Sequence, residues 1–331
     1  MSATLLFIHG RRQASPRDIA ADPARLATYV ATKKRNWLAG LSRGLMHAGL
    51  PPVTDAVFPF YGNEFRRSIE EYEAGGGRRP ELELGLPDDK QEKQLIEAKS
   101  AALIDALDAL GFDPARELSY LEPGLAVGAE GVRPEELGWG DVLRIPVLRA
   151  GLQFLSRKTG APAAIIEEFL TDVAYYLELE GMRSGVLDIL EQALRAALPN
   201  GGPVVVVGHS LGSIAAYDFL TRLPDGIDVR LLVTAGSPLG YPIVQKNLLG
   251  HQPGRRPRVP NAVPARAAAW LNAYDERDFV SLVHPLAGSY DVATKRQLVD
   301  ERTLNSSDPH SIADYLSDPD VAGPIGRAIP D

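Results

Sequence analysis

Short apolar runs that end in turns recur along the chain and predict strands. The clearest run lies at 203–208, where four consecutive valines suit a parallel strand that is buried on both faces. Within the run at 55–61, Pro59 removes a backbone donor and favours a place at a strand end. In all, the apolar runs predict strands at 4–9, 55–61, 203–208, 229–234, 265–274 and 297–303.

Helical periodicity fills the chain between these runs. Apolar positions recur at helical spacing within 17–50, 186–198 and 214–223, and Gly40 and Gly44 interrupt the first of these segments. A chain in which strands alternate with helices favours an α/β fold with a doubly wound, mostly parallel sheet.

The stretch from 63 to 180 differs from its surroundings, because it is charged and helical and no strand stands out in it. We expect it to be a helical cap inserted into a core domain formed by 1–62 and 181–331. Two of its segments, 139–155 and 165–179, are amphipathic and are expected to pack on the core domain. The alternative is a mobile lid or a helix that touches a membrane transiently, without stable insertion.

Composition places the chain among ordinary globular proteins, with 45% hydrophobic and 24% charged residues. A net charge of −8 argues against nucleic acid or an anionic membrane as the main partner, since both require a concentrated positive face. The local basic run at 254–258 is expected to be solvated surface. Because there is no cysteine, disulfides and thiolate chemistry are excluded. With no signal-peptide core, a cytoplasmic protein is expected.

The valine-rich run leads directly into Gly208-His209-Ser210-Leu211-Gly212 and then into a helical pattern. A strand, a sharp turn and a helix around G-x-S-x-G are typical of a nucleophile elbow. Ser210 is therefore the predicted nucleophile. Gly208 and Gly212 leave room for neighbouring backbone at a strained turn, and His209 is expected to support it. The helix that follows directs its first amides and positive dipole end at developing negative charge.

A serine nucleophile needs a histidine to accept its proton, and the histidine needs a carboxylate to orient it. With an elbow of this kind the chain order is serine, acid, histidine, which excludes the histidines that precede Ser210. His251 comes before the strand that could supply the acid, and His284 follows too soon after it. His310 remains as the predicted base. It lies in a loop before a final helix, which Asp308 is expected to cap.

Three carboxylates follow the strand at 265–274, at Asp275, Glu276 and Asp278. Asp278 is the predicted acid. Asp275 is the alternative acid. It is placed second because a loop carboxylate at that position could instead bond backbone amides and hold the turn. Glu276 is expected to be solvated.

An oxyanion hole needs two backbone amides, one after the serine and one from the loop after an early strand. Leu211 supplies the first. The strand at 4–9 ends in His9-Gly10, and Gly10 allows a tight turn over the serine, so Arg11 is expected to supply the second amide, with Arg12 as the alternative. His9 is expected to support this loop by hydrogen bonding.

Five motifs together resemble the lipase and esterase branch of the α/β-hydrolase superfamily. They are FIHG (7–10), VGHSLGS (207–213), TAGSPLG (234–240), WLNAYDERDFV (270–280) and DPHSIADYL (308–316). The resemblance covers about 1–62 and 200–320 and implies the α/β-hydrolase fold, with Asp278 matching the family's acid. Where the family's motif has Asp-Pro-Val, this chain has Asp278-Phe279-Val280. The resemblance implies hydrolysis of a lipid or other acyl ester, in preference to a small polar ester, without a cofactor. It does not extend to 63–180.

Other functions remain open from the sequence. The same triad would serve an amidase, a thioesterase or an acyltransferase, and a silent fold of this kind could act as a binding or signalling module. The presence of serine, acid, histidine and both glycines together favours an enzyme. A metal site is not expected, because neither HExxH nor a cluster of His and acid at ligand spacing occurs. Oligomeric state stays undetermined.

Overall fold

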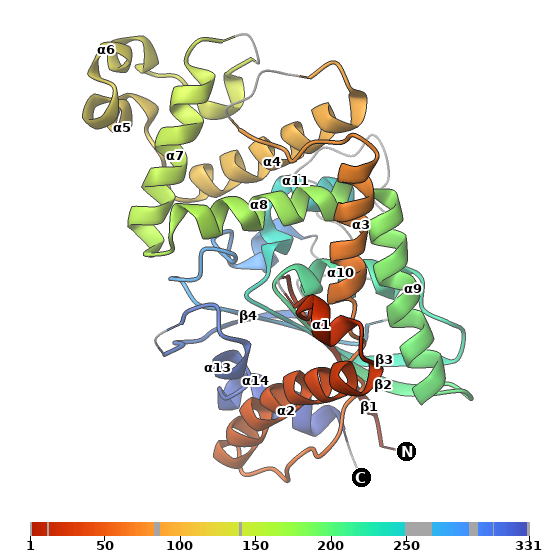
Figure 1. Ribbon diagram of the computed structural model, residues 1–331. Coiled ribbons are helices and arrows are strands. Elements are labelled where there is room, and N and C mark those ends of the chain that lie inside the picture. Colours follow the sequence, from red (N-terminus) through yellow and green to blue (C-terminus); the bar gives the residue numbers. More distant parts are fainter. Residues whose placement is uncertain are drawn as a thin grey trace.

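The computed structural model describes residues 2–11, 13–82, 87–138, 141–248, 267–290, 297–306 and 308–329. Within these residues the chain forms an α/β structure around a five-stranded sheet in which every neighbouring pair is parallel (Figure 1). The order across the sheet follows the order along the chain. Its strands are β1 (Thr4–Ile8), β2 (Gly202–His209), β3 (Ile227–Ala235), β4 (Trp270–Tyr274) and β5 (Leu298–Arg302).

The valines of β2 show why this strand is central. Val204 and Val206 face one apolar core, and Val205 and Val207 face a second core on the opposite side of the sheet. Successive side chains of a strand point to opposite faces, so a strand that is buried on both faces needs apolar residues at every position. The predicted parallel sheet is confirmed.

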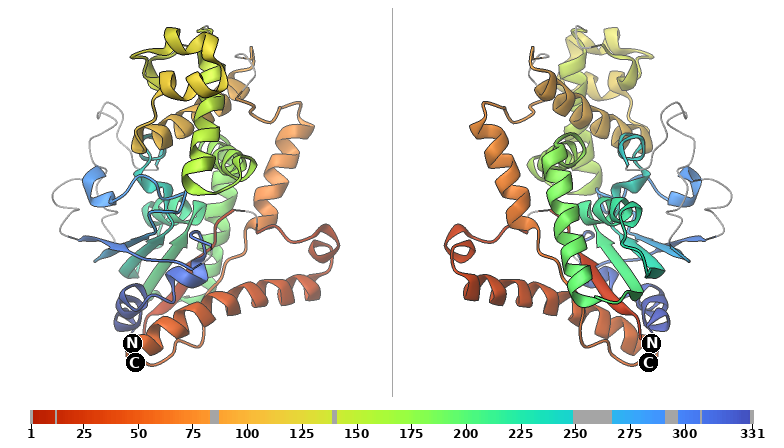
Figure 2. Two further views of the ribbon diagram at one scale, coloured as in Figure 1. Left: turned by 90° about the vertical axis from the view of Figure 1, so that its left-hand side faces the viewer. Right: turned by 90° about the vertical axis from the view of Figure 1, so that its right-hand side faces the viewer.

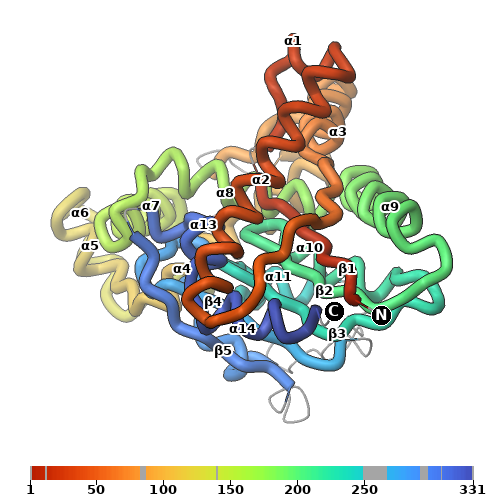
Figure 3. Tube along the Cα trace, turned by 90° about the horizontal axis from the view of Figure 1, so that it is seen from below, coloured from red at the N-terminus to blue at the C-terminus, as the bar shows by residue number. Residues whose placement is uncertain are grey.

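One face of the sheet is covered by α2 (Pro23–His47), α13 (Ile312–Tyr315) and α14 (Pro319–Ala328) (Figure 3). α2 is continuous through Gly40 and Gly44, although both glycines were expected to interrupt it. A Cβ atom at Gly40 would lie 2.7 Å from the Ala313 oxygen, and one at Gly44 would lie 2.5 Å from the Leu316 oxygen. These glycines therefore mark the positions where α2 packs closely against the C-terminal helices.

The other face carries α9 (Glu180–Ala197) and α10 (Leu211–Thr221), which share a core with β1 and β2. Figure 2 shows these two sets of helices on opposite sides of the sheet. α1 (Arg17–Ala20) contacts α2, α11 (Pro242–Asn247) contacts α4 (Lys90–Ala109), and α3 (Gly62–Ala74) contacts α9. The 3-10 turns η3 (Pro238–Gly240) and η4 (Leu286–Ser289) contact each other.

The remaining helices form a layer above one end of the sheet (Figure 1). We call α4 to α8 the upper helices. Their bounds are α4 (Lys90–Ala109), α5 (Pro114–Leu121), α6 (Pro123–Ala126), α7 (Arg144–Thr159) and α8 (Ala163–Glu178), with the 3-10 turns η1 (Val127–Ala129), which contacts α5 and α6, and η2 (Pro134–Glu136). The described part of 63–180 contains no strand, in line with the sequence. No helix among the described residues combines the length and apolar character needed to cross a membrane.

Two strand predictions need correction. The run at 55–61 forms only an isolated parallel bridge between Val57 and Leu6, since prolines at 51, 52 and 59 interrupt the backbone donors on both sides. The run at 265–274 becomes a regular strand only from Trp270, after a bridge at Ala267, and its first two residues lie outside the described residues. The basic run at 254–258 and Trp139 also lie outside them.

Candidate active site

Ser210 occupies the turn between β2 and α10 with φ 56° and ψ −132°. It is the only described residue other than glycine with a positive φ. Such a conformation costs of order 1–3 kcal/mol and persists only where surrounding contacts fix it. Here the Ser210 amide donates to the Ala235 oxygen at 3.0 Å, which ties the turn to the end of β3.

Three glycines let the segments around Ser210 approach one another. A Cβ atom at Gly208 would lie 2.8 Å from the Gly212 oxygen, and one at Gly10 would lie 2.7 Å from the Cβ of Ser210. A Cβ at Gly212 would collide with the backbone of His9. The turn after β1 and the start of α10 can therefore meet directly over the serine, as the sequence predicted.

The predicted base and acid are in contact. His310 Nδ1 lies 2.8 Å from Asp278 Oδ2, although 32 residues separate them in the chain. Asp278 is buried, and its other oxygen accepts from the Val280 amide at 2.9 Å. Because Nδ1 is bonded to the carboxylate, Nε2 is the ring nitrogen of His310 that remains for another partner.

Asp275 has a different role in the structure. Its carboxylate accepts from the Arg277 side chain at 2.7 Å and from the amides of Arg277 and Asn305, each at 2.8 Å. Burial alone would raise the pKa of Asp275, but these hydrogen bonds outweigh it and hold the pKa below its ordinary value. Asp275 thus holds the loop after β4, while Asp278 meets the histidine. Glu276 pairs with Arg302 at 2.9 Å on the surface.

His209 supports the loop that carries His310. Its Nε2 lies 3.0 Å from the His310 backbone oxygen, and the two rings are 4.5 Å apart between centroids. Burial, together with the neighbouring His310, holds the pKa of His209 well below its ordinary value. His209 is therefore neutral and donates a proton from Nε2 to that oxygen.

His9 holds the turn after β1, and its hydrogen bonds define the tautomer of its ring. Its Nε2 accepts from the Tyr61 amide at 3.2 Å, so Nδ1 carries the proton and donates to the Gly10 oxygen at 2.8 Å. Burial lowers the pKa of His9 to about 4, which keeps the ring neutral. The Gly10 oxygen and the Arg11 N–H belong to one planar trans peptide and point in opposite directions. By fixing the oxygen, His9 also fixes the direction of the Arg11 N–H.

Two amides are free near Ser210. Leu211 is the first residue of α10, and the first N–H groups of a helix have no acceptor within it. No described group accepts a hydrogen bond from the Arg11 amide. Arg12, the alternative donor, lies outside the described residues.

An open cleft of about 490 Å³ joins these residues, since Ser210, His310, Gly10 and Arg11 all line it. Its apolar walls come from four parts of the chain, namely Trp37, Ile165, Phe279 and Ile312. The Ser210 hydroxyl is buried and makes no hydrogen bond among the described residues. The bond between serine and histidine is thus not formed in this structure, as is common before a ligand tightens the geometry of such a site.

The amphipathic segments 139–155 and 165–179 contribute little to this cleft. Among the described residues of the two segments, only Ile165 lines it. The apolar side of α7 packs instead into two cores, with Val147 in a core of the upper helices and Leu155 in the core that also contains Val204 and Val206. The described part of α7 is therefore a packing element rather than a wall of the cleft.

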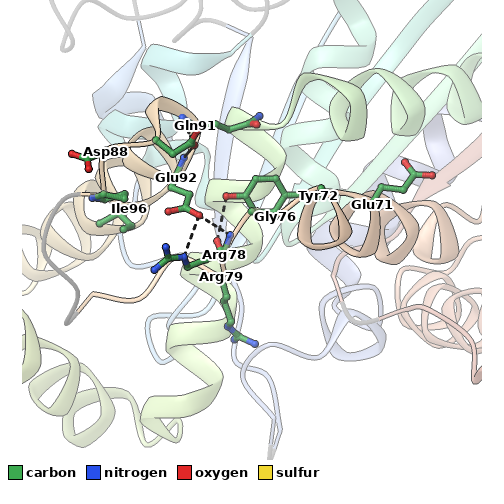
Figure 4. Close-up of a pocket in the computed structure, with 13 residues that line it drawn as sticks. Glu71, Tyr72, Gly76, Arg78, Arg79, Asp88, Gln91, Glu92 and Ile96 are labelled. Carbon is green, nitrogen blue, oxygen red and sulfur yellow. Dashed lines mark hydrogen bonds and ion pairs between the residues drawn. The ribbon is translucent and has the colours of Figure 1, made fainter.

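A larger cavity of about 780 Å³ lies away from the triad, between the end of α3 and the start of α4 (Figure 4). Side chains of both charges line it, and the Arg78 amide donates to Glu92 at 3.0 Å. The described residues that line it include no serine and no histidine. Among the described residues no group of three metal-ligating side chains gathers anywhere. The cleft at Ser210 is the better candidate because the polar groups of a known type of catalysis converge there.

Tyr315 was missed by the sequence analysis. Its buried hydroxyl donates to Asp278 Oδ2 at 2.8 Å and accepts from the Asp275 amide at 3.0 Å, so it holds both carboxylate positions. The only signal in the sequence is an aromatic residue in the helix after His310. The N-cap of α13 was also predicted wrongly. The Ser311 side chain caps this helix by accepting from the Asp314 amide, while Asp308 accepts from the His310 amide at 3.0 Å.

Comparison of the chain with protein-family models, with curated proteins and with solved structures found no match. The geometry of the cleft is therefore the basis for a function.

Proposed function

We propose that this protein is a serine hydrolase of the α/β-hydrolase type that cleaves carboxylic esters. The proposal depends on one observation. A serine on a strained turn lines the same cleft as a histidine whose Nδ1 lies 2.8 Å from a buried aspartate. A structural serine has no need of a backbone conformation that costs free energy, whereas a nucleophile elbow uses it to place the serine side chain at the end of the strand, beside the cleft.

In the proposed reaction the Ser210 oxygen attacks the carbonyl carbon of the ester while His310 Nε2 takes the serine proton. Asp278 stabilises the imidazolium that forms. The Leu211 and Arg11 amides donate to the oxyanion, and α10 directs the positive end of its dipole there. As the intermediate collapses, His310 gives the proton to the leaving alcohol and an acyl-enzyme forms. Water, activated by His310, then releases the acid and restores the serine. This chemistry uses no cofactor.

The substrate that we propose is an acyl or lipid-like ester. The apolar walls of the cleft at Trp37, Ile165, Phe279 and Ile312 suit an acyl chain. In this proposal the core domain comprises 1–62 and 181–331, and 63–180 is the cap. Because α8 supplies Ile165 to the cleft, α8 is the part of the cap that meets the substrate.

The proposal can be tested with a fluorophosphonate probe, which forms a covalent bond with an activated serine. We expect the wild type to be labelled and Ser210→Ala to remain unlabelled. Ser184→Ala is a matched control, since Ser184 lies on α9, where its hydroxyl bonds Glu180 on the surface. No labelling of the wild type, or equal labelling of Ser210→Ala, would falsify the proposal. Assays with matched ester, amide and thioester substrates then separate an esterase from an amidase, a thioesterase or an acyltransferase.

A further inference from the structure

The side chain of Arg11 is bound by one face of α8. Its Nε lies 2.5 Å from Asp172 Oδ2, and its Nη2 lies 3.1 Å from Glu168 Oε2. Its Nη1 donates to the Ile165 oxygen at 3.4 Å. Residues at such spacings share one face of a helix. We call Arg11, Glu168 and Asp172 the α8 clamp.

The clamp is more enclosed than an ordinary surface ion pair. The Arg11 side chain is 9% exposed, and those of Asp172 and Glu168 are 17% and 33% exposed. Burial raises the pKa of Asp172 above its ordinary value, although Arg11 acts against this shift. Ion pairs taken out of water often add little net stability, because desolvation offsets their attraction. These ion pairs are therefore better explained by the position that they give to Arg11 than by a gain in stability.

Arg11 also lines the cleft. Its amide is the second oxyanion donor in the proposed reaction, and the neighbouring Gly10 oxygen is held by His9 at 2.8 Å. His9 fixes this peptide from the side of the sheet, and α8 holds the side chain that projects from the same residue. The peptide is thus held from two directions by elements that are distant in the chain, α8 being more than 150 residues away.

We propose that Glu168 and Asp172 are positioning residues that set the place of the Arg11 amide in the oxyanion hole. The proposal rests on the proposed function, because it assigns a task within that reaction. Ile165, on the same face of α8, lines the cleft. Since α8 packs against α4 and α7, it links the upper helices to the catalytic backbone (Figure 1). A substrate that contacts Ile165 therefore meets the helix that also positions the oxyanion donor.

The test uses Asp172→Asn, Glu168→Gln and the double variant. Asp188→Asn is the control, because it removes an ion pair of 2.7 Å with Arg222 that does not line the cleft. Hydrolysis of p-nitrophenyl acetate gives kcat and KM, and the rate of fluorophosphonate labelling reports the nucleophile and oxyanion hole together. Loss of one oxyanion donor lowers kcat about 100- to 1000-fold, so displacement of a donor should lower kcat and labelling rate roughly 10-fold in the double variant. KM should change less than about twofold, since the donor acts mainly in the transition state.

Thermal unfolding distinguishes positioning from a structural role. If Asp172→Asn does not fold, Glu168→Gln and Arg11→Lys keep the test open, because Glu168 is one-third exposed and lysine keeps the charge of Arg11 without its fork. Folded variants with wild-type kcat, or with a raised KM and unchanged kcat, would overturn the positioning role. If the wild type itself is not labelled, the proposed function fails and the clamp fails with it. If the wild type is labelled and the clamp variants are labelled at the same rate, the positioning role of the clamp is rejected and the proposed function stands.

Discussion

Asp275 and Asp278 lie on one short loop but meet different partners. Asp278 is bonded to His310, while Asp275 is bonded to Arg277 and to the Asn305 amide. We expect Asp278→Asn to lower kcat by roughly 10⁴-fold, because the histidine loses the carboxylate that fixes its tautomer. Asp275→Asn should instead lower the free energy of unfolding by about 1–3 kcal/mol, because buried hydrogen bonds to a charge are lost. Parallel measurement of kcat and Tm separates these effects.

The assignment of the acid would be reversed by one result. If Asp275→Asn lost more kcat than Asp278→Asn at a temperature where both variants are folded, Asp275 would be the acid that orients the histidine. In that case Asp275→Asn would lose kcat and Asp278→Asn would lose Tm.

A second prediction at this scale concerns pH and His9. The pKa of His9 is about 4 in the folded chain, against an ordinary value of 6.5. Between these pH values the unfolded chain binds more protons than the folded chain. The contribution of His9 to the free energy of unfolding is therefore fully present above about pH 6.5 and is lost as the pH falls toward 4. From pH 7.5 to pH 5, His9 should account for a loss of about 2 kcal/mol. His209, whose pKa is lowered by burial, acts in the same direction.

Urea unfolding of the wild type and His9→Gln at both pH values measures this loss. We expect His9→Gln to be less stable at pH 7.5 but to lose about 2 kcal/mol less than the wild type on going to pH 5. His47→Gln, at an exposed position on α2, should keep the wild-type pH dependence. An equal loss in the wild type and His9→Gln would contradict a neutral, buried His9.

At the scale of elements, the packing of α2 can be tested through its glycines. A Cβ atom at Gly44 would lie 2.5 Å from both the Ala322 Cβ and the Leu316 oxygen. We expect Gly44→Ala to lower the free energy of unfolding by about 1–3 kcal/mol, because α2 must move away from α14. Gly181→Ala is the matched control, since Gly181 lies in α9 with nothing within 4 Å of its Cβ position, and alanine should stabilise that helix by up to about 1 kcal/mol. Equal Tm changes in the two variants would show that close packing at Gly44 is unimportant.

The sequence predicted elements whose signal is local. The valines of β2 and the glycines around Ser210 act within a few residues, so their pattern was sufficient for the strand and the turn. Gly44 was misread, because a helix tolerates glycine wherever a neighbouring helix needs the space, and that neighbour is far along the chain. Tyr315 was missed for a similar reason. Only the packing of α13 against the loop after β4 brings its hydroxyl to Asp278.

At the scale of the whole molecule, the cleft is assembled from segments that no short pattern connects. Its wall combines the turn after β1, the side of α2, the start of α8 and the loops after β4 and β5. Amphipathicity correctly indicated that α7 and α8 have apolar faces, but it could not indicate which face would meet the cleft. In the structure Ile165 of α8 lines the cleft, and the apolar face of α7 is buried among other helices.

This difference leads to a prediction about substrate choice. We expect Ile165→Ala to shift the preferred acyl length, because removing methyl groups from the cleft wall changes discrimination by about 1 kcal/mol for each methylene that loses or gains contact. Leu152→Ala on α7 is the matched control, as Leu152 packs against the core that also contains Val204 and Val206 and does not line the cleft. It should lower Tm and leave the profile unchanged. The kcat/KM values for p-nitrophenyl esters of increasing chain length, with Tm for each variant, give both readouts. A profile that changed with Leu152→Ala but not with Ile165→Ala would mean that the acyl chain lies against α7 and not in the cleft beside Ser210.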